Sequence, residues 1–118
     1  MAFRDGFPIL HVADVAASLA FYRDRLGFVE IYRHPETGEP GFVSLMLDAL
    51  KLGLVAEPTG ERSRVDLWLY CDDVDGEWTR LRDAGARGLQ EPADMPWGER
   101  TASVADPDGN VVWLGAKL

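Results

Sequence analysis

The sequence predicts an α+β fold in which one domain, residues 1–118, consists of two tandem βαβββ modules. Three observations support this prediction: an internal repeat, a capped amphipathic helix in each copy of the repeat, and strand-like runs that close each copy. The length of 118 residues suits one domain of ordinary size. We expect the modules at about 1–57 and about 65–118. A polar linker with proline and glycine is expected between them, at about 58–64.

The repeat becomes visible when the second half of the chain is aligned with the first at an offset of 59 residues. Residues 10–15, Leu-His-Val-Ala-Asp-Val, then resemble residues 69–74, Leu-Tyr-Cys-Asp-Asp-Val. Farther along, Arg23 matches Arg82 in the same register. Because the offset is half the chain length, each half is interpreted as one copy of the same module.

Each copy is predicted to begin with a strand followed by a helix. The apolar runs at 8–12 and 65–71 have strand length and are rich in β-branched or aromatic residues. Asp14 and Asp73 follow these runs, and an aspartate at this position caps a helix by accepting hydrogen bonds from its first free N–H groups. The two helices carry apolar stripes at matching spacing, which are Val15, Leu19, Tyr22 and Leu26 in the first and Val74, Trp78 and Leu81 in the second. We expect this stripe, including Trp78, to lie in the core.

The rest of each copy is predicted to form strands. In the first copy these are expected at 28–33, 42–47 and 50–56. The second copy is expected to contain a strand-like segment at 85–90, a long loop at 91–98, and strands at 99–105 and 110–115. Each module would then have one helix on one face of its sheet, which leaves the other face free to curl around a ligand or a partner.

The composition limits the possible partners. The net charge is −8, which repels nucleic-acid phosphates and anionic membranes and attracts cationic small molecules, although acidity can also serve solubility alone. No apolar run approaches the roughly 20 residues of a membrane span, and the N-terminal residues do not resemble a signal peptide. A single cysteine, Cys71, cannot form an internal disulfide. We therefore expect a cytoplasmic protein without nucleic-acid or membrane partners.

Two stretches of sequence carry a resemblance to a known superfamily. Residues 14–22, Asp-Val-Ala-Ala-Ser-Leu-Ala-Phe-Tyr, are followed by Leu-Gly-Phe at 26–28, and residues 106–110 read Asp-Pro-Asp-Gly-Asn. With the two βαβββ modules, they resemble the vicinal-oxygen-chelate superfamily, which includes glyoxalase I, extradiol dioxygenases, and fosfomycin- and bleomycin-resistance proteins. The resemblance covers residues 8–114 and implies a homodimer of cup-shaped curved mixed sheets with helices on the outer face.

Within this superfamily, the chain is most similar to the bleomycin-resistance branch. Residues 8–10, Pro-Ile-Leu, lead into the first helix without the usual histidine-valine opening. Residues 96–100, Pro-Trp-Gly-Glu-Arg, precede the last strand pair, where that branch carries a similar stretch. The resemblance thus implies ligand binding in clefts at the interface of two subunits.

The superfamily's enzymes hold a divalent metal with His, Gln or Glu side chains from four strands. The resemblance places these positions at Phe7, Gly53, Asp66 and Trp113, with Lys51 as the alternative to Gly53. Only Asp66 offers a suitable ligand atom, and one carboxylate does not hold a catalytic metal. We therefore expect no metal, no cofactor and no catalytic residue. The aromatic residues would instead line an apolar cleft for a planar or amphipathic ligand.

Strand alternation and the resemblance together predict the ligand-binding residues. They are Phe7, Ile9, His11, Asp66, Trp68, Tyr70, Trp97, Val111 and Trp113. The alternative is that these aromatic residues pack at a dimer interface. Asp66 is expected either to anchor a cationic group or to be an exposed strand-end carboxylate. Trp97, on a loop, is expected to cover the ligand or to contact a partner.

The remaining reactive side chains are expected to have structural roles. His11 is interpreted as a strand histidine with a hydrogen-bond partner, and His34 as loop surface. Cys71 is expected to be a buried, inert thiol, because no activating base lies near it in the sequence.

The main functional hypothesis is a binding protein that sequesters a flat, cationic or amphipathic compound, with bleomycin-type glycopeptides as the leading candidates. One alternative is a glyoxalase-like lyase or dioxygenase with a shifted metal site. Another is a ligand-responsive or structural module whose ligand is not an antibiotic.

Overall fold

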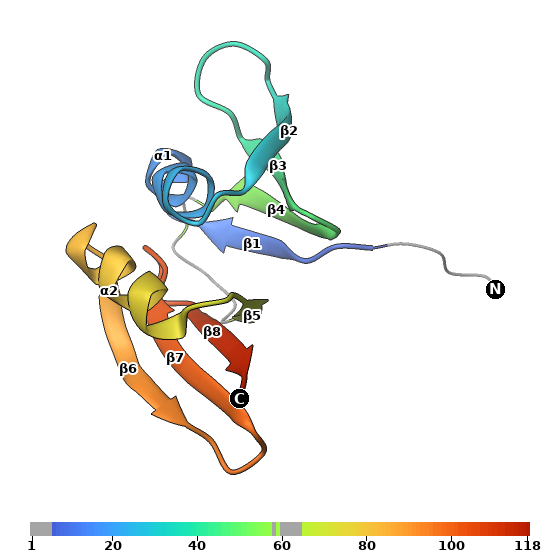
Figure 1. The fold of residues 1–118 in the computed structure, drawn as a ribbon. Helices are drawn as coiled ribbons and strands as arrows, with labels where there is room; N and C mark the ends of the chain where they lie inside the picture. The colour runs from blue at the N-terminus through green and yellow to red at the C-terminus, as the bar shows by residue number, and fades with distance from the viewer. Residues whose placement is uncertain (1–5, 58, 60–64) are drawn as a thin grey trace, which may run out of the picture. The chain divides into compact units, whose positions relative to one another are not determined.

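The computed structural model describes residues 6–57, 59 and 65–118, and the chain forms two compact units, Met1–Ser63 and Arg64–Leu118. Each unit has one four-stranded mixed sheet with a helical segment on one face (Figure 1). The predicted α+β class and the βαβββ order of each half are confirmed. Apart from Thr59, the expected linker at 58–64 lies outside the described residues.

The first unit contains a sheet with the strand order β1-β4-β3-β2. Strand β1 (Ile9–Val12) is parallel to β4 (Leu50–Ala56). Strand β3 (Phe42–Leu47) is antiparallel to β4 on one side and to β2 (Val29–His34) on the other. The predicted bounds of β3 and β4 agree with the structure, because turn-forming residues delimit both strands.

The helical segment of the first unit begins after Asp14, whose carboxylate accepts a hydrogen bond of 3.2 Å from the backbone N–H of Ala17. It starts as helix α1 (Val15–Leu19) and continues as a π-helical segment, η1 (Ala20–Arg25). The predicted N-cap is therefore present, whereas the change to π-helix was not expected from the apolar spacing.

The π-helical segment contributes two adjacent aromatic residues to the core. Its wider turn is closed by a hydrogen bond of 3.0 Å from the N–H of Leu26 to the carbonyl of Phe21. Phe21 and Tyr22 are both buried, and their rings meet edge to face with centroids 5.0 Å apart. The Tyr22 ring also meets that of Phe28 edge to face at 5.8 Å. Such pairs add to the stabilisation that burial alone provides.

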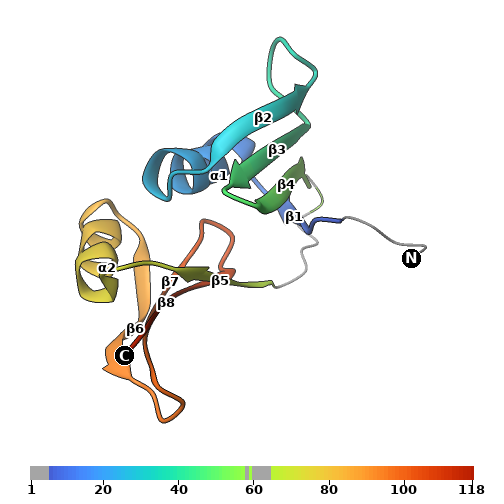
Figure 2. The same cartoon turned by 45° about the vertical axis from the view of Figure 1, so that its right-hand side comes forward.

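The second unit contains a sheet with the strand order β5-β8-β7-β6. Strand β5 (Asp66–Tyr70) is parallel to β8 (Val111–Lys117), and β7 (Glu99–Ala105) is antiparallel to β8 and to β6 (Arg87–Asp94). Helix α2 (Val74–Asp83) lies against one face of this sheet (Figure 2).

Helix α2 starts as predicted. The carboxylate of Asp73 accepts a hydrogen bond of 3.0 Å from the backbone N–H of Gly76. None of the helices in the described ranges is long and apolar enough to cross a membrane.

Each sheet buries the face that packs against its own helix. The buried strand residues are Leu10, Val12, Val43, Leu45, Leu52 and Leu54 in the first unit, and Leu67, Ala102, Val104, Val112 and Leu114 in the second. Burying one such side chain stabilises the fold by roughly 1.5–3 kcal/mol for the larger residues. Because successive strand residues point to opposite faces, the residues between these positions lie on the face without a helix. Most of the predicted ligand-binding residues are on that face.

Strand β6 is longer than the sequence predicted. The first half of the expected loop at 91–98 is strand, because β6 continues to Asp94, with Ala93 paired to Thr101 and Asp94 paired to Arg100. A register shift between Gln90 and Ala93 leaves Pro92 outside the regular strand pairing. Within the pairing, proline could not donate the backbone hydrogen bond that the neighbouring strand requires. The remaining turn covers residues 95–98.

Trp78 is half-buried, and the expectation that it lies in the core was only partly correct. Its indole N–H donates a hydrogen bond of 3.0 Å to the carbonyl of Ser103, and the guanidinium of Arg82 lies 5.0 Å from its ring centroid. The indole therefore covers the edge of the core, with its N–H group hydrogen-bonded to the backbone and its ring in contact with a guanidinium.

The predicted turn between β7 and β8 is stabilised by the carboxylate of Asp106. One oxygen of this buried side chain accepts hydrogen bonds from the backbone N–H groups of Asp108, at 2.9 Å, and Asn110, at 2.7 Å. The Asn110 side chain donates to the other oxygen at 2.8 Å and accepts a hydrogen bond of 2.9 Å from the N–H of Val65. This network fixes the residue before β5 next to the turn that precedes β8.

Candidate functional site

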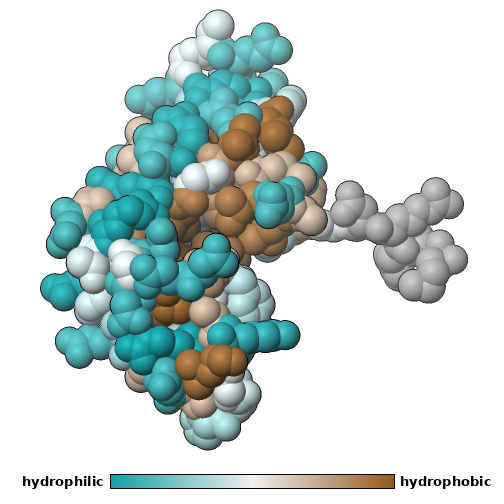
Figure 3. Space-filling view, in the orientation of Figure 1, coloured by the Kyte–Doolittle hydropathy of each residue, from teal (hydrophilic) through white to brown (hydrophobic). Residues whose placement is uncertain are grey.

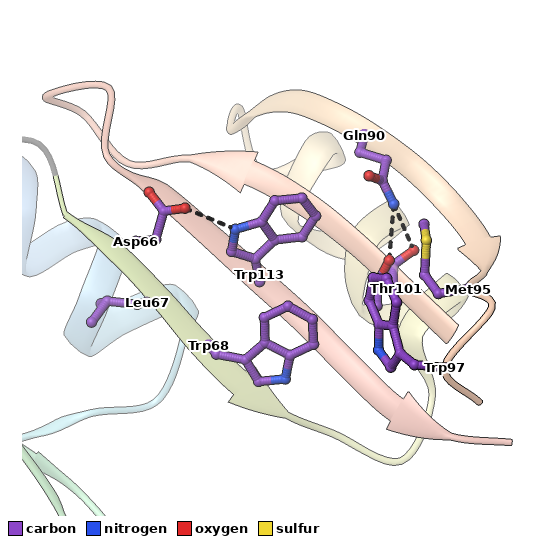
Figure 4. A pocket seen from close by; sticks show the side chains of 8 residues that line it. All are labelled: Asp66, Leu67, Trp68, Gln90, Met95, Trp97, Thr101 and Trp113. Carbon is purple, nitrogen blue, oxygen red and sulfur yellow. Dashed lines mark hydrogen bonds between the residues drawn. The ribbon is translucent and has the colours of Figure 1, made fainter. Parts of the chain in front are cut away.

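A pocket of about 340 Å³ lies on the face of the second sheet that does not carry α2 (Figure 4). Its lining residues come from all four strands of this sheet and from the turn between β6 and β7. They are Asp66, Leu67, Trp68, Gln90, Met95, Trp97, Thr101 and Trp113. All of them belong to the second unit.

Two tryptophans form the floor of the pocket. Trp68 and Trp113 are paired residues of the parallel strands β5 and β8, so their side chains emerge side by side from the same face. Their rings stack with centroids 5.7 Å apart and an angle of 22° between the planes. Trp68 remains 38% exposed, so a flat apolar surface is available to a ligand.

Asp66 supplies a negative charge next to this aromatic floor. It precedes Trp68 by two residues and therefore lies on the same face of β5. One of its carboxylate oxygens accepts a hydrogen bond of 3.3 Å from the indole N–H of Trp113, as Figure 4 shows. The carboxylate is exposed, so it can contact a cationic group of a bound molecule.

The opposite side of the pocket combines a polar pair with two side chains from the turn. Gln90 donates a hydrogen bond of 2.9 Å to the hydroxyl of Thr101. Met95 and Trp97 come from the turn before β7, where Gly98 adopts a φ of 94° that favours glycine. Trp97 is 63% exposed and borders the pocket across from the tryptophan floor (Figure 4).

Among the described residues that line the pocket, Asp66 is the only charged one. The nearby strand residue Arg100 is engaged elsewhere, because its guanidinium forms ion pairs with Asp75, at 2.6 Å, and Asp94, at 2.9 Å. Hydrogen bonding to Arg100 holds the pKa of the Asp75 carboxyl below its usual range. Among the lining residues that the structure describes, the pocket therefore presents a carboxylate and no cation, which favours cationic over anionic ligands.

The structure places the second-unit residues of the predicted site together. Asp66, Trp68, Trp97 and Trp113 line the pocket. Tyr70 lies beside it, with its ring centroid 6.2 Å from that of Trp68. Val111 pairs with Asp66 on the neighbouring strand but does not line the pocket.

The first-unit residues of the predicted site lie on their own sheet. The Nζ atom of Lys51 is 4.5 Å from the ring centroid of Phe7, and Ile9 pairs with Gly53. His11 is exposed, with its Nδ1 atom 3.7 Å from a carboxylate oxygen of Glu57. These side chains occupy the sheet face without a helix, but they do not contribute to the pocket of the second unit.

Strand register determines which residues are equivalent in the two units. Ile9 pairs with Gly53 as Trp68 pairs with Trp113, in the same parallel arrangement. This supports Gly53 rather than Lys51 as the counterpart of Trp113. Within residues 6–57, 59 and 65–118, no three His, Cys, Asp or Glu side chains converge in a way that suits a metal ion.

The other reactive side chains lie apart from the pocket. His34 is exposed at the end of β2. Cys71 is partly buried, and burial, together with the negative charge of Glu77, raises the pKa of its thiol. A thiol of this kind is a poor nucleophile at neutral pH.

Sequence reasoning missed the polar side of the pocket. Thr101 shares a face with residues 99 and 103 of a strand whose bounds were predicted correctly, so alternation along β7 could have identified it. Gln90 lies next to the register shift in β6, where alternation fails. Met95 was assigned to a loop without a role.

A second pocket, of about 630 Å³, lies in the first unit between α1, β2 and the loop near residue 39. Its basic side chains are already paired. Arg33 donates two hydrogen bonds of 2.7 Å to Glu30, and Arg23 forms ion pairs with Asp24 and Glu30. None of the described residues that line this pocket is aromatic, so it lacks the flat stacking surface of the pocket in the second unit.

Comparison with known proteins identifies the family. The sequence model of the Glyoxalase/Bleomycin resistance protein/Dioxygenase superfamily matches residues 7–114. This chain belongs to that superfamily. The resemblance drawn from residues 14–28 and 106–110 is thereby confirmed.

Relatives within the glyoxalase/bleomycin resistance superfamily cover nearly the whole chain. A bleomycin resistance protein from Geobacillus stearothermophilus is 29% identical over 124 residues, which cover 89% of this chain and 90% of that protein. The uncharacterized protein YetH of Bacillus subtilis is 25% identical over 114 residues, covering 92% of this chain and 94% of YetH.

Solved structures of the superfamily have the same fold. TnmS3, an antibiotic binding protein from Streptomyces sp. CB03234, superposes with a TM-score of 0.76 at 28% identity, covering 100% of this chain and 99% of TnmS3. TioX from Micromonospora sp. ML1 gives a TM-score of 0.82 at 23% identity, covering 98% of this chain and 100% of TioX, and this likeness concerns the fold.

Proposed function

We propose that this protein binds a planar or amphipathic cationic small molecule in the pocket of the second unit and sequesters it without chemical change. The stacked pair Trp68 and Trp113, with the Asp66 carboxylate beside it, carries this proposal. The indole faces would stack on a flat ligand, and the carboxylate would attract its positive charge. Tight binding lowers the concentration of free ligand by mass action, so no catalytic group is required.

Bleomycin-type glycopeptides are the leading ligand candidates. The bleomycin resistance protein of Geobacillus stearothermophilus, and the description of TnmS3 as an antibiotic binding protein, support an antibiotic as the ligand. The net charge of −8 favours a cationic compound and disfavours nucleic acids and anionic membranes as partners. A ligand other than an antibiotic is the alternative within this proposal.

We also propose that the protein acts as a homodimer with its ligand-binding clefts at the subunit interface. Each sheet has one face without a helix, and large apolar side chains are exposed there. Figure 3 shows a hydrophobic patch at the surface over the strands of the first unit. The large apolar or aromatic side chains exposed in this unit include Ile9, Val29, Ile31 and Tyr32. Tyr70 and Trp97 are exposed in the second unit. Apolar surface of this extent favours association with another subunit.

An enzymatic function, as a glyoxalase-like lyase or a dioxygenase, is the second candidate. It requires a divalent metal at a shifted site that includes Asp66. It predicts that Ni²⁺, Zn²⁺, Mn²⁺ or Fe²⁺ raises the melting temperature, and that Asp66→Asn abolishes this gain. An unchanged melting temperature with all four ions would rule this candidate out.

Isothermal titration with metal-free and copper-bound bleomycin, at two salt concentrations, tests the binding proposal. We expect submicromolar affinity, one ligand per subunit, and weaker binding at high salt. Asp66→Asn should weaken binding roughly five- to tenfold and reduce the salt dependence. Asp83→Asn, which removes an exposed charge at the end of α2, serves as the control and should bind like the wild type.

The outcomes separate the parts of the proposal. Absence of both heat and a melting-temperature shift would eliminate bleomycin, and other planar cations would then be titrated. Binding that is equally strong in Asp66→Asn and in Trp113→Phe would place the ligand outside this pocket. Sedimentation equilibrium tests the dimer, and a monomer at micromolar concentration would contradict it.

A further inference from the structure

The carboxylate of Glu99 connects two exposed aromatic side chains beside the pocket. It accepts a hydrogen bond of 2.7 Å from the indole N–H of Trp97. The Glu99 carboxylate, and to a smaller extent burial, also raise the pKa of the nearby Tyr70 hydroxyl. Trp97 and Tyr70 are 63% and 64% exposed, so packing alone does not fix their orientations.

The sheet register shows that Tyr70 of β5 and Glu99 of β7 lie on the same face of the second sheet. Tyr70 pairs with Gly115 on the intervening strand β8, and Gly115 pairs with Thr101 on β7. Glu99 lies two residues before Thr101 on the same face. Because Gly115 has no side chain, the indole of Trp68 lies over β8 at this level, and the ring of Tyr70 lies beside that indole on the face that carries Glu99.

The backbone around Glu99 is held by hydrogen bonds, whereas the Trp97 side chain is largely exposed. The carbonyl of Glu99 accepts a hydrogen bond of 2.7 Å from the N–H of Met95, and the N–H of Gly98 donates to the carbonyl of Met95 at 3.1 Å. These bonds close the hairpin at the first residue of β7. The Glu99 carboxylate is thus anchored on a defined backbone and can hold the exposed indole of Trp97.

We propose that Glu99 is a positioning residue that holds Trp97 over the pocket and Tyr70 beside Trp68, so that a ligand meets a preformed aromatic wall. Glu99 does not line the pocket and would act through these two side chains. The benefit is preorganisation, because an exposed tryptophan that is already held loses less conformational entropy when a ligand binds. This inference rests on the proposed function of the pocket.

The first test observes Trp97 in the ligand-free protein. The indole ¹H–¹⁵N resonance of Trp97 is assigned by its loss in Trp97→Phe. In Glu99→Ala it should move towards the position of a solvent-exposed indole, and its N–H should exchange faster with water. Glu99→Gln retains an oxygen that accepts the hydrogen bond and should preserve most of the wild-type behaviour. Glu91→Ala, at an exposed glutamate of β6, is the control.

The second test is titration of the same variants with bleomycin. Glu99→Ala should weaken binding roughly three- to tenfold, mainly through faster dissociation, whereas Glu99→Gln should stay within about twofold of the wild type. Equal losses in both variants would mean that the Glu99 charge acts on the ligand directly, and would overturn the positioning role. An unchanged Trp97 resonance in Glu99→Ala would overturn it as well. If wild-type protein does not bind bleomycin, the proposed function fails for this ligand, while the indole resonance still decides whether Glu99 holds Trp97.

Discussion

A Cβ atom on Gly115 would lie 2.8 Å from Nε1 of Trp68, closer than Cβ atoms approach other side chains in folded proteins. The indole of Trp68 therefore rests directly on the backbone of β8. Glycine at this position allows Trp68 to lie flat beside Trp113. The aromatic floor of the pocket thus depends on a residue that contributes no side chain to it.

Gly115→Ala should displace Trp68 and weaken ligand binding roughly three- to tenfold, because part of the stacking surface is lost. The near-ultraviolet circular dichroism of the stacked indoles should decrease in parallel. Gly41→Ala is the matched control, since a Cβ atom there has only the carbonyl of His34 within 4 Å, at 3.9 Å. Unchanged dichroism and affinity in Gly115→Ala would contradict this prediction, because they would show that the Trp68 indole keeps its stacking surface when a methyl group is added.

Leu81→Ala should destabilise the protein by about 2–5 kcal/mol, because this side chain of α2 is 1% exposed and its loss leaves a cavity. Leu89→Ala removes the same atoms from a side chain of β6 that is 43% exposed, and should change stability by less than about 0.5 kcal/mol. Urea unfolding, followed by circular dichroism, measures both values. Similar losses in the two variants would contradict the assignment of the core face.

Asn110→Ala should cost about 1–3 kcal/mol of unfolding free energy, because the buried carboxylate of Asp106 loses the amide donor at 2.8 Å. The N–H of Val65 also loses its acceptor. Asn110→Asp places a second carboxylate beside Asp106 and should be at least as destabilising at pH 7. Thermal unfolding of both variants tests this expectation, which a loss below about 0.5 kcal/mol would contradict.

The stability contributed by Glu30 should disappear in acid. Hydrogen bonds from Arg33 hold the pKa of Glu30 below its usual value of 4.5, although burial acts in the opposite direction. A depressed carboxyl pKa stabilises the folded state above the unfolded-state pKa, and this contribution is lost as the pH falls through the folded-state pKa. Glu30→Gln should therefore lower the urea midpoint at pH 7 but much less at pH 3. Glu36→Gln, at an exposed glutamate, is the control for the change of side chain.

Cys71 should react slowly with iodoacetamide. Its pKa is raised by burial and by nearby negative charge, so the thiolate fraction at pH 8 is smaller than that of free cysteine. We expect alkylation roughly tenfold slower than for free cysteine, with the difference abolished in concentrated urea. Mass spectrometry of timed samples measures the rate. A rate equal to that of free cysteine in the folded protein would contradict this assignment.

Much of the fold could be predicted because local sequence determines it. The bounds of β3, β4 and β7 agree with the expected ranges, and Asp14 and Asp73 cap the helices as expected. The π-helical turn, the extension of β6 and the partial exposure of Trp78 were not predictable in this way. Each depends on tertiary partners or on a register shift that apolar spacing does not reveal.

The candidate site, like the fold, could be predicted only where regular strand alternation determines the side-chain positions. Asp66, Trp68 and Trp113 lie together because they are on two paired strands with regular alternation, and their role in ligand binding stays a prediction. The roles of Gln90 and Glu99 escaped prediction because both depend on contacts across strands. For Gln90, the intervening register shift also disrupts the alternation.

Because the two sheets have matching registers, residues at equivalent positions of the duplicated module can be compared directly. The pair Trp68 and Trp113 in one half corresponds to Ile9 and Gly53 in the other. The second copy thus carries an aromatic pair at a position where the first copy has an aliphatic residue and a glycine. The ring of Phe42 now occupies the space above Gly53, 3.1 Å from where a Cβ atom would lie. An engineer who wished to build a second aromatic floor would have to remove Phe42 before introducing the tryptophans.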